Sequence, residues 1–187
     1  MILPIFAYGQ PVLKQEGEQL EIKTHSNLPE LIQNMWDTMY AAKGVGLAAP
    51  QIGLSLKLFI VDTKPYEEEG KPFAGIKKVF INPVKLEEIG APWTFEEGCL
   101  SIPDLRADID RPPAIRLKYQ DESGAEIEEL FEGLNARVIQ HEYDHVQGIL
   151  FIDLLKPLKK RMMQRRLEAI KKGQIDTEYR LKFYRKP

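Results

Sequence analysis

Apolar residues recur every three or four positions in three stretches of the chain, a spacing that predicts three amphipathic helices. The first begins near Asn27, where Asn27 and Glu30 have the spacing of a capping box, and Gly44 supplies a stop. The apolar face of this helix is expected to pack on the core. It consists of Leu28, Leu31, Ile32, Met35, Met39 and Ala42.

The second predicted helix runs from about Leu134 to Gln147, and the third from Pro157 to the residue before Gly173. Pro157 suits the first position of a helix. One face of the second helix, which should point inward, carries Leu134, Val138, His141 and His145. The third helix has a narrow apolar stripe and otherwise basic faces. Its stripe is Leu158, Met162, Met163, Leu167 and Ile170.

Between the first two helices the pattern changes to the alternation that is typical of strands. Leu56, Leu58 and Ile60 alternate, 79–81 is a short buried run, and Ile115, Leu117 and Tyr119 alternate before a hairpin turn at 121–124 that leads into 127–131. Prolines divide this stretch into short segments. We therefore expect an α+β fold in which antiparallel or mixed sheets pack around the second helix, with an N-terminal helix and a basic C-terminal helix.

Length and composition indicate one globular domain over residues 1–187, with the basic helix at about 157–172 and a tail at 173–187. The single cysteine excludes a disulfide scaffold. No apolar run is long enough to cross a membrane, and the N-terminus lacks the features of a secretory signal. These features favour a cytoplasmic protein that binds no membrane.

Charge is unevenly distributed along the chain. Residues 156–187 carry +9 and residues 1–155 carry −11, which gives the net charge of −2. The basic helix is either a solvated face or a surface for nucleic-acid phosphates. DNA is not expected as a partner.

The strongest chemical signal is the segment His141-Glu142-Tyr143-Asp144-His145, which holds two of the three histidines. On a helix, imidazoles at i and i+4 lie one above the other and can bind one divalent ion, while the glutamate between them lies beside the ion. The alternative is a surface pair of histidines. It is disfavoured because both residues lie on the apolar face, where an unpaired imidazole is costly.

A catalytic site of this type needs a third protein ligand and an open position. The metzincin pattern is excluded, because Phe151 stands where that pattern requires histidine, and His25 lies in a polar loop where it is expected to be exposed. A glutamate from a later helix remains an alternative. Cys99, which follows Gly98, is the best third ligand, since a thiolate with two imidazoles suits Zn, Fe(II), Co or Ni. Taken alone, Cys99 would more simply be a small buried apolar residue.

A glycine-rich segment at 44–51 follows the first helix. Its two glycines and small residues leave a backbone with which an extended peptide can pair as an added strand. It lacks the Gly-Lys-Ser/Thr of a Walker loop and is too short for a dinucleotide-binding fingerprint. By itself it would be only a loop that ends the helix.

Three segments in this order, 44–51 (GVGLAAPQ), 97–101 (EGCLS) and 140–145 (QHEYDH), resemble the signature motifs of peptide deformylases. These enzymes remove the N-formyl group from nascent polypeptides. Residues 106–112 and 148–151 also resemble that family, so the likeness covers most of 1–172. Asp104, after Pro103, departs from the glycine that is more usual there.

The resemblance implies a role for each matching residue. Cys99, His141 and His145 would bind one divalent ion, with Fe(II) as the native metal and Zn or Ni as substitutes. Glu142 would be the general acid and base, while Gln51 and the backbone N–H of Leu100 would hold the formyl oxygen. Val138 and Leu47 would line a pocket for methionine, and Arg106 would contact the far end of the substrate. The full set of substrate-binding residues would be Gly44, Val45, Gly46, Leu47, Glu97, Gly98, Arg106 and Val138.

The implied function is the hydrolysis of N-formylmethionyl peptides with release of formate. In this family the C-terminal helix docks on ribosomal RNA in some bacteria, so the ribosome is a possible partner here. Two alternatives stay open: a metalloendopeptidase with a carboxylate as third ligand, and a non-catalytic module in which the ion only stabilises the fold. The second leaves Glu142 without a purpose.

Overall fold

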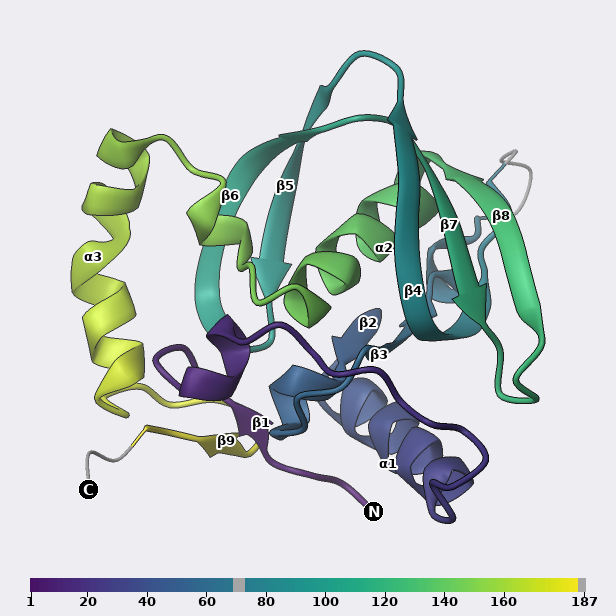
Figure 1. The fold of residues 1–187 in the computed structure, drawn as a ribbon. Helices are drawn as coiled ribbons and strands as arrows, with labels where there is room; N and C mark the ends of the chain where they lie inside the picture. Colours follow the sequence, from purple (N-terminus) through teal and green to yellow (C-terminus); the bar gives the residue numbers. More distant parts are fainter. Residues whose placement is uncertain (69–72, 185–187) are drawn as a thin grey trace.

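The structure, a computed structural model, describes residues 1–68 and 73–184 (Figure 1). Within these residues it contains three α-helices, Leu28–Ala41 (α1), Gly133–Val146 (α2) and Pro157–Lys171 (α3). All three predicted helices are therefore present, each within about three residues of its predicted ends. Short 3₁₀ turns lie at Pro11–Lys14, Ala49–Ile52, Lys64–Tyr66 and Phe151–Asp153.

The largest sheet has five strands in the order β2-β3-β4-β7-β8, and every neighbouring pair is antiparallel. Its strands are Gly46–Ala48 (β2), Leu58–Asp62 (β3), Lys77–Ile89 (β4), Ala114–Gln120 (β7) and Glu126–Glu132 (β8). The predicted hairpin turn joins β7 to β8, where Gly124 has a φ of +86° and donates to the carbonyl of Asp121 at 3.0 Å. The expected α+β fold with antiparallel sheets is confirmed.

Two smaller sheets complete the described fold. Trp93–Cys99 (β5) pairs antiparallel with Ile102–Arg111 (β6), and Ile5–Phe6 (β1) pairs parallel with Leu181–Lys182 (β9). The last pair joins the two ends of the chain, as Figure 1 shows beside the N-terminus. We did not predict β9, because a two-residue strand leaves no periodicity in the sequence.

The five-stranded sheet separates two apolar clusters, and alternation along β3 supplies both of them. Leu58 and Ile60 pack with the apolar face of α1, while Phe59 and Val61 pack with α2. A third cluster joins β6, the turn at Phe151–Asp153 and α3. Figure 1 shows α2 enclosed between the β5–β6 ribbon and strands β4 and β7.

Both predicted signals for the ends of α1 are wrong in detail. The side chain of Asn27 makes no capping bond, because the preceding turn runs into the helix and the N–H of Leu28 donates to the carbonyl of His25 at 3.0 Å. At the other end the left-handed residue is Lys43, with a φ of +57°, and not Gly44. Gly44 serves close packing instead, since a Cβ there would lie 2.8 Å from Cδ1 of Leu100.

The predicted apolar stripe of α3 is only partly correct. Leu167 and Ile170 are buried and Met163 packs beside them, but Leu158 and Met162 are 74% and 79% exposed. A helix turns about 100° per residue, so Leu158, nine residues before Leu167, lies on the opposite side. The apolar positions therefore form two faces, one that packs on the protein and one that is exposed.

None of the described helices is long and apolar enough to cross a membrane.

Truncation to alanine should lower the free energy of unfolding by different amounts on the two faces of α3. Leu167→Ala removes a fully buried side chain and is expected to lower the free energy of unfolding by about 2–5 kcal/mol. Met162→Ala, on the exposed face of the same helix, should change it by less than about 0.5 kcal/mol. Denaturant unfolding of both variants measures the difference, and equal costs would contradict the assigned orientation of the helix.

Candidate active site

Helix α2 and the end of β5 bring three potential metal ligands together. His141 and His145 lie one turn apart on α2, and Cys99 is the last residue of β5. Their ligand atoms all lie within 4.8 Å of one another, and Sγ of Cys99 is 3.2 Å from Nε2 of His145. The set does not include His25, which lies half-buried in a turn before α1 and not fully exposed as predicted.

A change of register between β5 and β6 places Cys99 in this group. The regular pairing of the two strands shifts between Gly98 and Cys99, where the chain turns toward Ile102. Such a shift redirects a side chain relative to the regular alternation of the strand. As a result Cys99 faces the histidines, although β5 and α2 are far apart in the sequence.

One buried carboxylate orients the first histidine. Nδ1 of His141 donates to Oε2 of Glu97 at 3.0 Å, and this bond leaves Nε2 of the same ring free to bind an ion. Burial lowers the pKa of His141, but the contacts with Cys99 and Glu97 outweigh it and raise that pKa above its ordinary value. For His145, burial lowers the pKa, which keeps this ring neutral as a ligand must be.

Two arginines hold Glu97 in place. Arg111 donates through Nε at 2.7 Å and Nη2 at 3.1 Å, and Arg137 donates through Nη1 at 3.0 Å. Arg111 also pairs with Asp144 of α2 at 2.7 Å, so the buried cluster contains two guanidinium groups and two carboxylates. Burial alone would raise the pKa of Glu97, but its contacts with His141 and Arg111 hold that pKa well below its usual range. Glu97 is therefore ionised throughout the neutral range.

Sequence reasoning did not identify either arginine. Arg137 is only 2% exposed, with its guanidinium over the Trp93 ring and bonded to the carbonyls of Trp93 and Ile109. In the sequence Arg137 is a single charge between apolar residues, and Arg111 is one of five charged residues in its strand, a pattern that is also typical of exposed residues. The partners that make these charges tolerable come from other elements, so no local signal could have revealed them.

Glu142 is buried beside the ligands and lines the same cavity. Its Oε2 has no hydrogen-bond partner within the described residues, and burial raises its pKa to about 7. A Cβ at Gly46 would lie 2.4 Å from Oε1 of Glu142. Glycine at position 46 therefore creates the space that this carboxyl occupies.

Gln51 presents its amide nitrogen toward the ligand group. Its Oε1 accepts from the N–H of Ala48 at 2.9 Å, which fixes the amide, and its Nε2 lies 3.5 Å from Sγ of Cys99 and 3.3 Å from Oγ of Ser101. Gln51 is almost fully buried. It is thus a preorganised hydrogen-bond donor next to Cys99.

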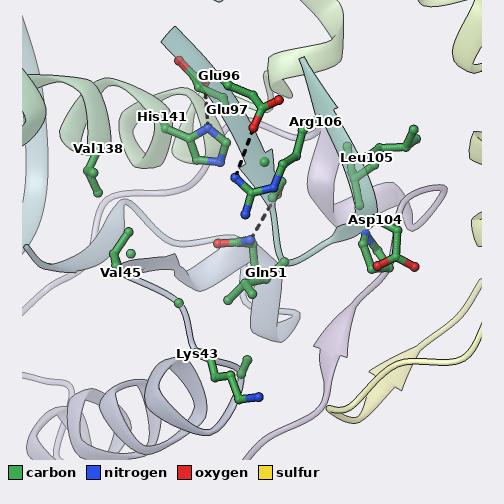
Figure 2. A pocket seen from close by; sticks show the side chains of 18 of the residues that line it. Lys43, Val45, Gln51, Glu96, Glu97, Asp104, Leu105, Arg106, Val138 and His141 are labelled. Atoms are coloured by element: carbon green, nitrogen blue, oxygen red, sulfur yellow. Dashed lines mark hydrogen bonds and ion pairs between the residues drawn. The ribbon is translucent and has the colours of Figure 1, made fainter. Parts of the chain in front are cut away.

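A cavity of about 960 Å³ opens in front of these residues. Figure 2 shows Val45, Gln51, Arg106 and His141 directed toward it from different elements, with Val138 on α2. Its lining includes nearly all of the predicted site residues: Gly44, Val45, Gly46, Gln51, Glu97, Gly98, Cys99, Leu100, Arg106, Val138, His141 and Glu142. His145, 1% exposed, lies behind them.

The expectation that the side chain of Leu47 lines a methionine pocket is not supported by its position. Leu47 is fully buried and belongs to the cluster that packs on α1. Neighbouring side chains alternate on a strand, and Gly46 faces Glu142 on α2. The side chain of Leu47 must therefore point to the other face of the sheet. Only the backbone of Leu47 can then contact a substrate.

Arg106 lies at the rim of the cavity, with its side chain 67% exposed. Its Nη1 is 3.7 Å from Oε2 of Glu96, which is similarly exposed (Figure 2). An exposed ion pair of this kind contributes little to stability, so Arg106 is free to exchange Glu96 for another partner. Asp104, near the start of the same strand β6, has a φ of +59°, the conformation that glycine adopts most easily.

The three donors fit a divalent ion. One sulfur and two imidazole nitrogens converge at the floor of a cavity, and the chain supplies a soft and borderline ligand set of the type that binds Fe(II), Zn or Ni. Three protein ligands beside an open cavity leave a position for water or substrate. The hydrogen bond from Nδ1 of His141 to Glu97 supports the ligand geometry, because it fixes the orientation of that ring.

Comparison with known proteins agrees with this geometry. The family model described as polypeptide deformylase matches residues 2–161. The chain is 52% identical to a peptide deformylase of Christiangramia forsetii, covering 98% of this chain and 96% of that protein. It is 48% identical to a peptide deformylase of Flavobacterium johnsoniae, with the same two coverages.

Solved structures give the same result. The peptide deformylase of Thermus thermophilus superposes with a TM-score of 0.82 at 38% identity, covering 92% of this chain and 99% of that one. That of Legionella pneumophila gives 0.80 at 38% identity, covering 93% and 98%. The fold and the donor set define a hydrolase with a metal-binding group. The chain belongs to the polypeptide deformylase family, whose members are enzymes of protein biosynthesis.

The environment of Glu97 predicts the effect of neutralising it. Glu97→Gln leaves two buried guanidinium groups with one carboxylate fewer, and it weakens the acceptor for Nδ1 of His141. We expect the free energy of unfolding to fall by about 3–5 kcal/mol and metal affinity to fall about 10–100-fold. Denaturant unfolding without metal and chelator competition measure the two effects.

Glu96→Gln is the matched control for this substitution. It makes the same chemical change one residue away, on a side chain that is 60% exposed. Both quantities should stay near the wild-type values. If Glu97→Gln and Glu96→Gln bind metal equally well, Glu97 does not support the ligand geometry.

Proposed function

We propose that the protein is a metal-dependent hydrolase that removes the formyl group from the N-terminal methionine of nascent polypeptides and releases formate. The observation that carries this proposal is the convergence of Cys99, His141 and His145 beside the buried carboxyl of Glu142, at the floor of an open cavity. Membership in the deformylase family supports it. We further propose that residues 1–187 form one catalytic domain of a cytoplasmic protein.

We assign Cys99, His141 and His145 as ligands of one divalent ion, Fe(II) in the native protein with Zn or Ni as substitutes. Such an ion supplies a Lewis acid that makes a water molecule acidic enough to react at neutral pH. The chain's own contribution is to present one thiolate and two imidazole rings to it. Burial keeps the ring of His145 neutral, and the bond from Nδ1 of His141 to Glu97 orients that ring with its Nε2 toward the ion.

Glu142 is the general base and then the general acid. Its carboxylate takes a proton from the attacking water as the water oxygen bonds to the formyl carbon. It then gives this proton to the amine nitrogen as the carbon–nitrogen bond breaks, so the products are formate and a free amino terminus. A pKa of about 7, raised by burial, is near the operating pH and suits a group that must do both.

Gln51 and Leu100 stabilise the charge that develops on the formyl oxygen. Nε2 of Gln51 lies 3.5 Å from Sγ of Cys99, and Leu100 is the next residue along the chain, so both donors border the ligand group. The contact of Gln51 with Ala48 fixes its amide before substrate arrives. A preorganised donor of this type contributes roughly 3–4 kcal/mol to transition-state stabilisation.

Substrate would bind as an extended peptide along the backbone of residues 44–47, with Glu97 and Gly98 on the other side. Val138 and Leu134 on α2 give that part of the cavity an apolar surface for the methionine side chain. Arg106, exposed at the rim, is placed to contact residues farther along the peptide. A formyl carbon bears only hydrogen, so a cramped site beside Glu142 admits it more easily than an internal peptide carbonyl.

Formate release from a formyl-methionyl peptide tests the proposal. The iron-loaded protein should release formate, and Glu142→Ala should lower kcat by about 10²–10⁴-fold because proton transfer is lost. Metal content should not change, since Glu142 is not a ligand. Glu132→Ala, an exposed glutamate at the start of the same helix, is the matched control and should retain activity.

The same assay separates the alternatives. A metalloendopeptidase would cleave internal bonds, and with a carboxylate as third ligand its Cys99→Ser variant would keep its metal. A module in which the ion only stabilises the fold would show no turnover at full metal occupancy. Either result would contradict the deformylase assignment.

The exposed face of α3 supports a second proposal, that the protein docks on ribosomal RNA. Arg161 and Arg165 are exposed there beside Leu158 and Met162. Other basic residues of the helix are engaged with the protein itself: Lys160 pairs with Asp153, and Arg166 with Asp104. Arg185 and Lys186 of the basic tail lie outside the described residues.

Phosphate contacts make this docking sensitive to salt and to charge reversal. Cosedimentation with ribosomes should weaken at least tenfold between about 50 and 200 mM salt. The double variant Arg161→Glu/Arg165→Glu should bind more weakly than wild type at low salt. Lys64→Glu, an exposed lysine away from α3, should not. Binding that is independent of salt, or equal for both variants, would remove the proposal.

A further inference from the structure

The C-terminal segment returns to the cavity after α3. Asp176, Thr177, Glu178 and Tyr179 are among the residues that line it, together with the ligand group. Figure 1 shows this segment, in yellow, leaving α3 and passing back to strand β1. It lies beyond residue 161, where the match to the family model ends.

Backbone pairing holds the segment in this position. β9 pairs with β1, the N–H of Ile5 donates to the carbonyl of Arg180 at 2.9 Å, and that of Ala7 donates to the carbonyl of Lys182 at 3.0 Å. The side chains of Tyr179 and Leu181 pack against the cluster beneath α1. The segment is therefore docked on the body of the protein and does not trail from α3.

Two contacts join the segment to the two loops that border the cavity. Oη of Tyr179 donates to the backbone carbonyl of Leu100 at 2.8 Å. Nζ of Lys43 pairs with Oε2 of Glu178 at 2.6 Å, at the entry to the glycine-rich segment. These loops also touch each other, since a Cβ on Gly44 would lie 2.8 Å from Cδ1 of Leu100.

The exposure of the side chains shows which of these two contacts restrains the loop at Leu100. Lys43 and Glu178 have side chains that are 78% and 80% exposed, and an ion pair in that setting contributes little to stability. Tyr179 is half-buried, and Oγ1 of Thr177 donates to its carbonyl at 2.6 Å. Burial, together with the charges of Cys99 and Asp104, raises the pKa of Tyr179, so its hydroxyl remains a donor at neutral pH. A sheltered donor to a backbone carbonyl restrains Leu100 more effectively than the exposed pair does.

We propose that the segment Asp176–Tyr179 completes the substrate site and that Tyr179 is a positioning residue for Leu100. This inference rests on the proposed function, in which the backbone N–H of Leu100 holds the formyl oxygen. Tyr179 does not touch the reacting atoms. It fixes the residue that follows Cys99, so that the N–H is already aimed when charge develops.

Tyr179→Phe tests the inference, because it removes only the hydroxyl and keeps the packed ring. Looser positioning of the Leu100 N–H, a donor used in the transition state, should lower kcat about five- to fiftyfold with KM changed less than about twofold. Hydrogen exchange measured by mass spectrometry should become faster in peptides that cover residues 99–105 and stay unchanged in α2. Metal content should equal that of wild type.

Tyr40→Phe is the matched control. It removes a hydroxyl that donates to Oδ2 of Asp62 at 2.5 Å, on a side chain outside the cavity lining. Activity and exchange at 99–105 should stay at wild-type values. If Tyr179→Phe does not fold, Thr177→Ala replaces it as the test, because it removes the bond to the carbonyl of Tyr179. It should also lower kcat and speed exchange at 99–105, both by smaller amounts.

The inference requires both a lower kcat and faster exchange at residues 99–105, and either change without the other overturns it. Unchanged kcat with faster exchange would show that the bond from Tyr179 to Leu100 has only a structural role. A lower kcat with unchanged exchange would show that Tyr179 does not act through the position of Leu100. A failed deformylase assignment would appear differently, as wild-type protein that releases no formate. The exchange measurement would still report whether Tyr179 holds the loop.

Discussion

The buried carboxylate of Glu97 is the interaction on which the site depends. It joins three elements, because it lies on β5, accepts from Arg111 on β6 and accepts from Arg137 and His141 on α2. Ionised groups of this kind are tolerated in the interior only when paired. The cluster therefore fixes the position of α2 relative to the β5–β6 ribbon, and with it the distance between the histidines and Cys99.

The rest of the site follows from small residues placed around that arrangement. Gly46 leaves room for Glu142, and Gly44 lets the first loop approach Leu100. In both cases a side chain would collide with the neighbouring group. The glycine-rich segment thus has a steric purpose here, which differs from the helix stop expected for Gly44.

Pattern and spacing predicted those parts of the protein that are encoded locally. The two histidines of α2 are one turn apart, so their shared face follows from helical geometry, and Cys99 was preferred as their partner over His25 and a later glutamate. Several positions were misjudged, and for the side chains of Leu47 and Leu158 the reason is that their surroundings come from distant parts of the chain. Leu47 packs toward α1, and Leu158 faces solvent.

The amino-acid sequence by itself determined the helices, the alternating strands and the identity of the three candidate ligands, because each depends on spacing within a few residues or on the few cysteines and histidines present. Only the tertiary structure decided which charges are buried, how Cys99 turns toward α2 and that the last strand returns to the cavity. Those features arise from contacts between segments far apart in the chain. Such contacts leave no periodic signal, since a buried arginine and an exposed one are the same letter.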